Sequence, residues 1–161
     1  MSAIAADSGT AIGSLYQFFP NREAIVEALA EQYLADWHAM RAEVASSRPH
    51  ELRASIDAGI DARVRFHLEH AAVSRLLETH TPTARAIHEL QTELEGAVAF
   101  LSSYGPEIPS KKLRLYARMV NAMVNGVMAT IVDVSLSETQ RRALVEELKS
   151  VVHAYLEKRL R

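Results

Sequence analysis

Apolar residues recur at helical spacing along almost the whole of this 161-residue sequence. No segment shows the alternation of apolar and polar residues that is typical of a half-buried strand. Apolar positions three and four residues apart are instead the pattern of an amphipathic helix. The sequence therefore predicts an all-α fold, with helices over residues 2–8, 10–18, 21–44, 51–66, 70–78, 84–102, 111–132 and 137–160.

Prolines and polar clusters indicate where these helices begin and end. Pro20 ends the second helix, because a residue before proline avoids helical geometry, and Asn21 is a good N-cap for the third. The cluster SSRPH at residues 46–50 is the best candidate for a boundary. We therefore expect one domain over residues 1–46 and a second over residues 47–161. The sequence SETQ at residues 137–140 predicts a capping box at the start of the last helix.

The composition excludes several classes of protein. There is no cysteine, which rules out disulfides and thiolate chemistry and fits a cytoplasmic protein. No apolar run approaches the ~18 residues of a membrane span, and the first residues do not resemble a secretory signal. The sequence also lacks a glycine-rich phosphate loop, a Gly-x-Ser-x-Gly elbow and a His-Glu-x-x-His motif, so we do not expect an enzyme.

Histidines offer the one hint of a metal site, and it is weak. His67 and His70 are three residues apart and could share a helical face. A closed site needs three or four converging ligands, and local spacing positions only these two. We therefore predict no metal and no cofactor.

The last two predicted helices are unusually apolar. Residues 111–132 are apolar around nearly the whole helix, and residues 137–160 carry a broad apolar face. A helix of this kind is buried on most sides. Two such helices pairing with two from a second copy would form a four-helix interface and a symmetric homodimer, which we favour over a wholly intramolecular core.

The stretch GTAIGSLYQFFPNREAIVEAL at residues 9–29 concentrates small, hydroxyl-bearing and aromatic side chains. Two short helices joined by a glycine-containing turn are typical of a helix-turn-helix. In this arrangement Ile4, Ala5, Ile12 and Leu15 can pack inward. Small and polar side chains can then face a DNA groove, where hydroxyls bond phosphate oxygens and glutamine bonds an adenine edge. These side chains are Thr10, Ala11, Ser14, Tyr16 and Gln17.

The same stretch closely resembles the DNA-binding motif of tetracycline-repressor (TetR) type transcriptional regulators. The resemblance covers about 27 residues and is carried by Ile4-Ala5, Ser8-Gly9-Thr10, Gly13-Ser14-Leu15-Tyr16, Phe18-Phe19-Pro20 and Arg22-Glu23. It implies that Ser14, Tyr16 and Arg22 contact phosphates. It also implies that Thr10, Ala11, Ile12 and Gln17 lie near base edges, although Ile12 equally fits an inward position.

Two features depart from the family pattern. TetR regulators begin with a further helix and a basic arm, and this sequence starts where that helix should already have ended. Residues 1–28 also contain one basic side chain, Arg22, against Asp7, Glu23 and Glu27, which gives a net charge of -2. We favour a start at an internal methionine or a shortened chain as the explanation. A protein that lost DNA binding and kept its sensing half is the alternative.

The resemblance places an effector pocket among the helices that follow Pro49. Flexible apolar side chains and amides are the candidates to line it. These candidates are Phe66, Met119, Asn121, Met123 and Asn125, and for each of them packing in the core is the alternative role. We expect a small, apolar effector. The predicted function is a ligand-responsive DNA-binding regulator of the TetR type, and the alternative is a dimeric small-molecule-binding protein of the same fold without DNA binding.

Overall fold

The computed structural model describes residues 1–47, 49–78 and 84–160, apart from the side chains of residues 78 and 84–91. These residues form eight α-helices and no strand, which confirms the all-α prediction. The helices are α1 (Ser2–Asp7), α2 (Ile12–Phe18), α3 (Arg22–Ser46), α4 (Leu52–Glu69), α5 (Ala71–Glu78), α6 (Ala84–Ser102), α7 (Ser110–Ile131) and α8 (Glu138–Glu157).

The predicted starts of α3 and α8 agree with the structure because their capping side chains lie where the sequence places them. Oδ1 of Asn21 accepts a 2.8 Å hydrogen bond from the backbone N–H of Ala24 and so caps α3. Ser137 and Gln140 form the predicted reciprocal capping box at the start of α8. Each such cap satisfies backbone N–H groups that a helix start leaves unpaired.

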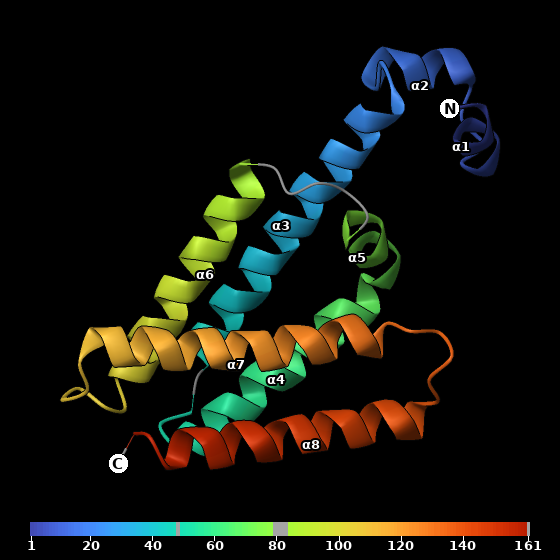
Figure 1. Cartoon of the computed structure of the whole chain (residues 1–161). Coiled ribbons are helices and arrows are strands. Elements are labelled where there is room, and N and C mark those ends of the chain that lie inside the picture. Colours follow the sequence, from blue (N-terminus) through green and yellow to red (C-terminus); the bar gives the residue numbers. More distant parts are fainter. Residues whose placement is uncertain (48, 79–83, 161) are drawn as a thin grey trace.

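The helices form a body and a projecting arm (Figure 1). The body is built from α4 to α8, in which α7 packs against α6 and α8, and α4 packs against both α7 and α8. The arm is α3, which contacts α4 and α5 and carries α1 and α2 at its far end. Within the described parts of the chain, α1 and α2 pack against each other and contact no helix of the body.

The core of the body lies between the inner faces of α7 and α8. The most completely buried large side chains there are all aliphatic or methionine: Leu113, Met128, Ile131, Val152 and Leu156. Ile56 and Ile60 of α4 and Leu101 of α6 extend this cluster. The predicted apolar faces of the last two helices are thus buried within one chain on their inner sides.

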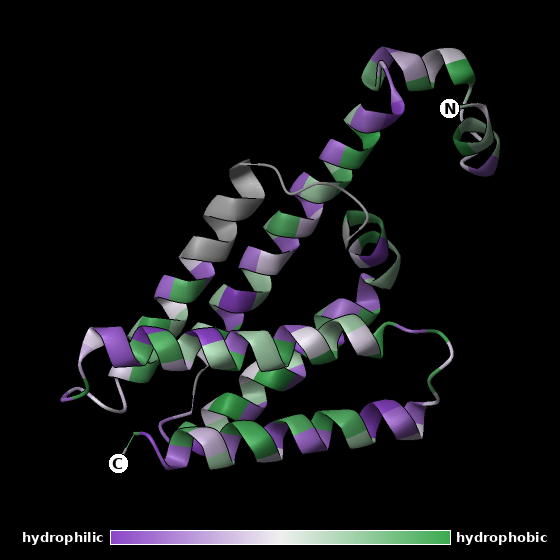
Figure 2. Ribbon diagram, in the orientation of Figure 1, coloured by the Kyte–Doolittle hydropathy of each residue, from purple (hydrophilic) through white to green (hydrophobic). Residues whose placement is uncertain are grey.

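Helix α3 differs from the helices of the body. Figure 2 shows polar and apolar residues alternating along its ribbon without a continuous apolar face. Trp37 is buried, whereas Leu29 in the N-terminal half of the helix is exposed. A long helix of this type bridges two parts of a molecule, and here it joins the α1–α2 module to the body.

Candidate functional site

The turn between α1 and α2 depends on Gly9. Its φ is +64°, a left-handed conformation that side chains disfavour. The N–H of Gly9 donates to the carbonyl of Ala6 over 3.2 Å, and the N–H of Thr10 donates to the carbonyl of Ala5 over 3.0 Å. This pair of bonds is a Schellman motif. It ends α1 and fixes the direction in which α2 begins.

The two short helices pack against each other, and each buries one apolar residue. Ala5 and Leu15 are buried, as predicted. The prediction of inward packing is wrong for Ile4 and Ile12, which are 37% and 45% exposed. Two helices of six and seven residues have room for little more than one buried pair between them, and no other described helix packs on this module.

The residues predicted to touch DNA share one property, which is exposure to solvent. All seven are exposed: Thr10, Ala11, Ile12, Ser14, Tyr16, Gln17 and Arg22. The first six lie just before or within α2, and Arg22 is the first residue of α3, beside its Asn21 cap. Phe18, at the end of α2, is 77% exposed.

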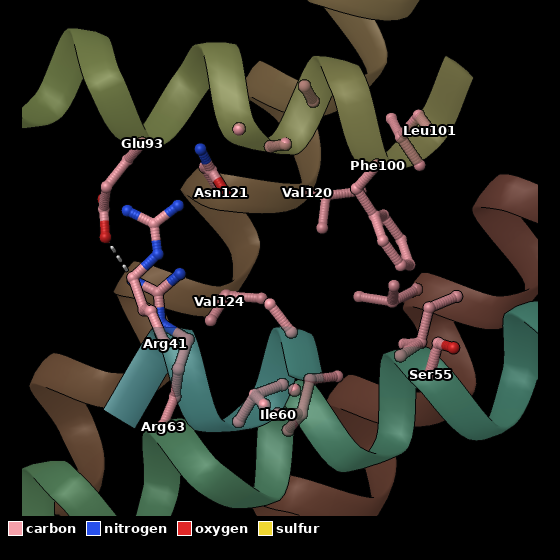
Figure 3. Close-up of a pocket in the computed structure, with 18 of the residues that line it drawn as sticks. Arg41, Ser55, Ile60, Arg63, Glu93, Phe100, Leu101, Val120, Asn121 and Val124 are labelled. Atoms are coloured by element: carbon pink, nitrogen blue, oxygen red, sulfur yellow. Dashed lines mark ion pairs between the residues drawn. The ribbon is translucent and has the colours of Figure 1, made fainter. Parts of the chain in front are cut away.

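A cavity of about 390 Å³ lies between α3 and the body and is lined by residues of five helices. Its walls are mostly apolar, and Figure 3 shows its lining side chains. The lining residues are Trp37, Met40, Arg41, Val44 and Ala45 of α3; Ser55, Ile56, Gly59, Ile60 and Arg63 of α4; Glu93, Gly96, Ala97, Phe100 and Leu101 of α6; Ala117, Val120, Asn121 and Val124 of α7; and Val152 and Leu156 of α8.

One end of this cavity is polar. The guanidinium of Arg63 donates from Nη2 to Oδ1 of Asn125 over 2.7 Å, and the same nitrogen lies 4.0 Å from Oε1 of Glu93. Its carbon Cζ lies 4.9 Å from the centre of the Trp37 ring. Burial lowers the pKa of Arg63, an effect that the carboxylate of Glu93 opposes and the charge of Arg41 reinforces.

Arg41 brings a second guanidinium to the same end. Figure 3 shows it beside Arg63, with Asn121 and Glu93 across from the pair. A Cβ placed on Gly96 would lie 2.7 Å from Nη2 of Arg41. The missing side chain of Gly96 therefore leaves the space in which the Arg41 guanidinium lies against α6.

The opposite end of the cavity is apolar, and its one hydroxyl is already bonded. Oγ of Ser55 donates to the carbonyl of Pro49 over 2.6 Å and lies 2.9 Å from the hydroxyl of Tyr104. Apolar side chains lie beside it, among them Phe100 and Leu101 (Figure 3). The cavity can thus accommodate the apolar part of a ligand while presenting charged side chains at one end.

Comparison with known families matches residues 51–156 to the model described as tetracyclin repressor-like, C-terminal domain. The chain belongs to this family. No curated protein matches the sequence. The matched residues extend from the residue before α4 almost to the end of α8 and include most of the cavity wall, so the TetR-like domain and the cavity largely coincide.

The residues predicted to bind the effector lie in different environments, and one of them lines the cavity. Asn121 lines the cavity, and Asn125, one turn further along α7, bonds to Arg63 from outside the cavity lining. Met123 packs against the apolar core, and Met119 is exposed. Phe66 is buried against Tyr33, Trp37 and His70.

His67 and His70 belong to this same aromatic group rather than to a polar cleft. The His70 ring stacks on Phe66 with 4.3 Å between ring centres, and its Nε2 lies 3.4 Å from Oδ2 of Asp36. Nδ1 of His67 lies 3.4 Å from Oγ of Ser74. Among the residues whose side chains are described, no three or more His, Asp or Glu side chains gather as a metal site would require.

The sequence reading missed the two arginines of the cavity. Arg41 follows Trp37 by four residues, and Arg63 follows Ile60 by three, so each interrupts an apolar stripe. A charged residue inside an apolar stripe was the available signal.

In the described part of the chain, no helix is both long and apolar enough to cross a bilayer.

Proposed function

We propose that this protein is a ligand-responsive DNA-binding transcriptional regulator of the TetR type that acts as a homodimer. Helix α2 enters the major groove of operator DNA, and the cavity between α3 and the body binds a small effector. The observation that carries the proposal is the continuity of α3. One unbroken helix begins beside the α1–α2 module at Arg22 and ends on the cavity wall at Val44 and Ala45.

The geometry of α3 supports a mechanical link between effector and DNA. A helix of 25 residues is about 37 Å long at 1.5 Å per residue. Because α3 contributes five residues to the cavity lining, an effector that shifts its inner end moves α2 at its outer end. In a dimer the two α2 helices must fit successive major grooves about one helical turn apart, so this movement changes operator affinity.

The effector acts in this scheme by population shift. A ligand changes the equilibrium between two states only through its different affinity for them. The state with α3 packed tightly against the cavity and the state with α3 displaced offer different walls to a bound molecule. A molecule that binds more tightly to the state with α3 displaced therefore causes the protein to release DNA.

The outer faces of α7 and α8 support homodimer formation. Leu115, Met119, Ala122 and Gly126 follow one another at spacings of four, three and four residues, and all are exposed. Val151 of α8 adds a further exposed apolar side chain. Apolar residues at this spacing form the contact line of a packed helix pair, so a second copy covers the faces that the body leaves open.

The charge of residues 1–28 favours the alternative function. A net charge of -2 in the DNA-contacting part weakens any binding that depends on neutralising phosphates. The alternative is a dimeric small-molecule-binding protein with the same body and no role on DNA.

Selection of bound duplexes from a random DNA library tests the proposal with the full chain. A regulator enriches a pseudo-palindrome whose half-sites are about one helical turn apart, and its effector lowers the affinity for that site. Failure to enrich any sequence, together with retained ligand binding, would reject the regulator and leave the alternative. An effector that binds without altering operator affinity would reject the proposed switch.

A further inference from the structure

We infer that the cavity takes an amphipathic monoanion, an apolar molecule with a single carboxylate that Arg41 and Arg63 hold at the polar end. This inference rests on the proposed effector-sensing function and specifies the chemical class of the effector. It goes beyond the purely apolar effector expected from the sequence, because the structure brings two arginines and one glutamate into a cavity whose walls are mostly apolar.

The charge balance of the lining favours an anion. Among the described lining residues the ionised groups are Arg41, Arg63 and Glu93, which give two positive charges and one negative charge, a net of +1. The pair between Arg63 and Glu93 is loose, with 4.0 Å between Nη2 and Oε1. Among these described lining residues one positive charge is therefore not balanced by a carboxylate.

Arg63 also carries a donor that has no acceptor. Its Nε is buried and lacks a hydrogen-bond partner among the described residues. An unsatisfied buried donor is destabilising, and native structures contain few of them. A ligand carboxylate beside Arg63 would supply the missing acceptor.

Arg41 completes the arrangement. None of the ion pairs between described side chains includes Arg41, and its guanidinium lies in the space left by Gly96. Figure 3 shows this guanidinium at the same end as that of Arg63. Guanidinium groups bind carboxylates through paired, charge-assisted hydrogen bonds, so two of them at one end suit a single acid group.

Glu93 and the apolar end restrict the ligand further. A carboxylate next to the binding position repels a second negative charge, which is the way a site discriminates against closely related ligands. Glu93 therefore disfavours dianions such as phosphate monoesters. At the far end Phe100 and Leu101 are apolar and the hydroxyl of Ser55 is already bonded, so the described lining there offers no free polar group for a second head group. The rest of the ligand is therefore hydrocarbon or aromatic.

Calorimetric titration of the full chain with matched probes tests this inference. The aliphatic probes are decanoate, decanol, decylammonium and decyl phosphate, and the aromatic pair is naphthoate and naphthylmethanol. We expect a carboxylate of at least one pair to bind about tenfold or more tightly than its alcohol, in line with the strength of charge-assisted hydrogen bonds. Decyl phosphate binds more weakly than decanoate, and decylammonium does not bind.

Four substitutions assign the effect to the polar end. Arg41→Met and Arg63→Met each weaken carboxylate binding about tenfold and so narrow the gap between the affinities for carboxylate and alcohol. Glu93→Gln strengthens carboxylate binding and removes the discrimination against decyl phosphate. Arg114→Met is the matched control, because Arg114 pairs with Glu95 and does not line the cavity. Thermal unfolding verifies that each variant folds. If Arg63→Met does not fold, Arg41→Met and Glu93→Gln are sufficient to test the inference.

Three results would overturn the inference. They are equal binding of acid and alcohol in both pairs, unchanged carboxylate binding in Arg41→Met, and no binding of either acid. These outcomes are independent of DNA. Tight carboxylate binding by a chain that enriches no operator would reject the regulator function and keep the inferred ligand class.

Discussion

Asn125 accepts a 2.7 Å hydrogen bond from Nη2 of Arg63, and this bond joins α7 to α4 beside the polar end of the cavity. The same guanidinium faces Glu93 of α6. One side chain therefore connects three helices of the body. In this arrangement the Nε of Arg63 is buried and has no acceptor among the described residues.

Replacing Asn125 by leucine tests this connection. Asn125→Leu removes the acceptor and leaves the Arg63 guanidinium with one bond fewer, so we expect the free energy of unfolding to fall by about 1 kcal/mol. In the double variant with Arg63→Met both polar partners are gone, and the loss should be smaller than the sum of the two single losses. Urea denaturation measures all three variants, and strictly additive losses would show that the bond contributes nothing.

His67 makes the stability of the fold depend on pH. Burial lowers its pKa from 6.5 to about 4, with smaller contributions from Arg63 and His70. Between these two values the unfolded chain binds more protons than the folded protein, so stability is lost as the pH falls from 6.5 toward 4. Because His67 is partly exposed, solvent screening reduces the loss to roughly 1–2 kcal/mol.

The comparison of His67→Gln with the parent protein isolates this effect. Denaturation of both proteins at pH 7 and pH 4.5 should show a smaller difference between the two pH values for the variant, since glutamine does not titrate. His50→Gln is the control, because His50 is exposed and lies outside the aromatic group. An equal pH dependence in parent and His67→Gln proteins would disprove the role of His67.

The helices were predictable from the sequence because local signals determine them. Pro20, the Asn21 cap and the capping box at Ser137 each act within one helical turn, and the structure has them in place. Apolar periodicity likewise located α4 and α7. The inward position predicted for Ile12 was wrong because its burial would require a neighbouring helix to pack on it. The spacing of apolar residues within one helix does not predict such a neighbour.

The cavity was less predictable because it is assembled from five helices. Periodicity assigns Asn121 and Met119 to one apolar helix, but which side of α7 faces α4 depends on packing between distant segments. Asn121 lines the cavity, whereas Met119 is exposed. Arg41 and Arg63 are 22 positions apart in the sequence, and only the packing of α3 on α4 brings their charges together.

A charge placed on the outer face of α7 should separate the proposed dimer. Leu115 and Met119 are 56% and 43% exposed in the single chain and lie on the face that the second copy would cover. Leu115→Glu or Met119→Glu would place an unpaired carboxylate in an apolar contact, at a cost of several kcal/mol. We expect the parent to sediment as a dimer and each variant as a folded monomer.

The control for this experiment is Leu68→Glu. Leu68 is also an exposed apolar residue, but it lies near the end of α4 rather than on α7 or α8. The variant should remain dimeric. A parent protein that sediments as a monomer at every concentration would instead support the wholly intramolecular core.

Substitutions of Arg22 and Gln17 should affect DNA binding in different ways. Arg22 at the start of α3 is expected to neutralise one phosphate, so Arg22→Gln should lower affinity for all duplexes and reduce the slope of log affinity against log salt by about one. Gln17→Ala should cost about 1–3 kcal/mol on the selected operator and relax the preference at one base pair.

Fluorescence anisotropy with the selected duplex and a scrambled duplex separates these effects. Gln32→Ala is the matched control, because Gln32 is an exposed glutamine of α3 whose side chain bonds to Asp36 rather than facing the predicted DNA surface. It should bind as the parent does. If Gln17→Ala and Arg22→Gln also bind as the parent does, α2 does not read the operator, and any DNA affinity of this chain arises from another surface.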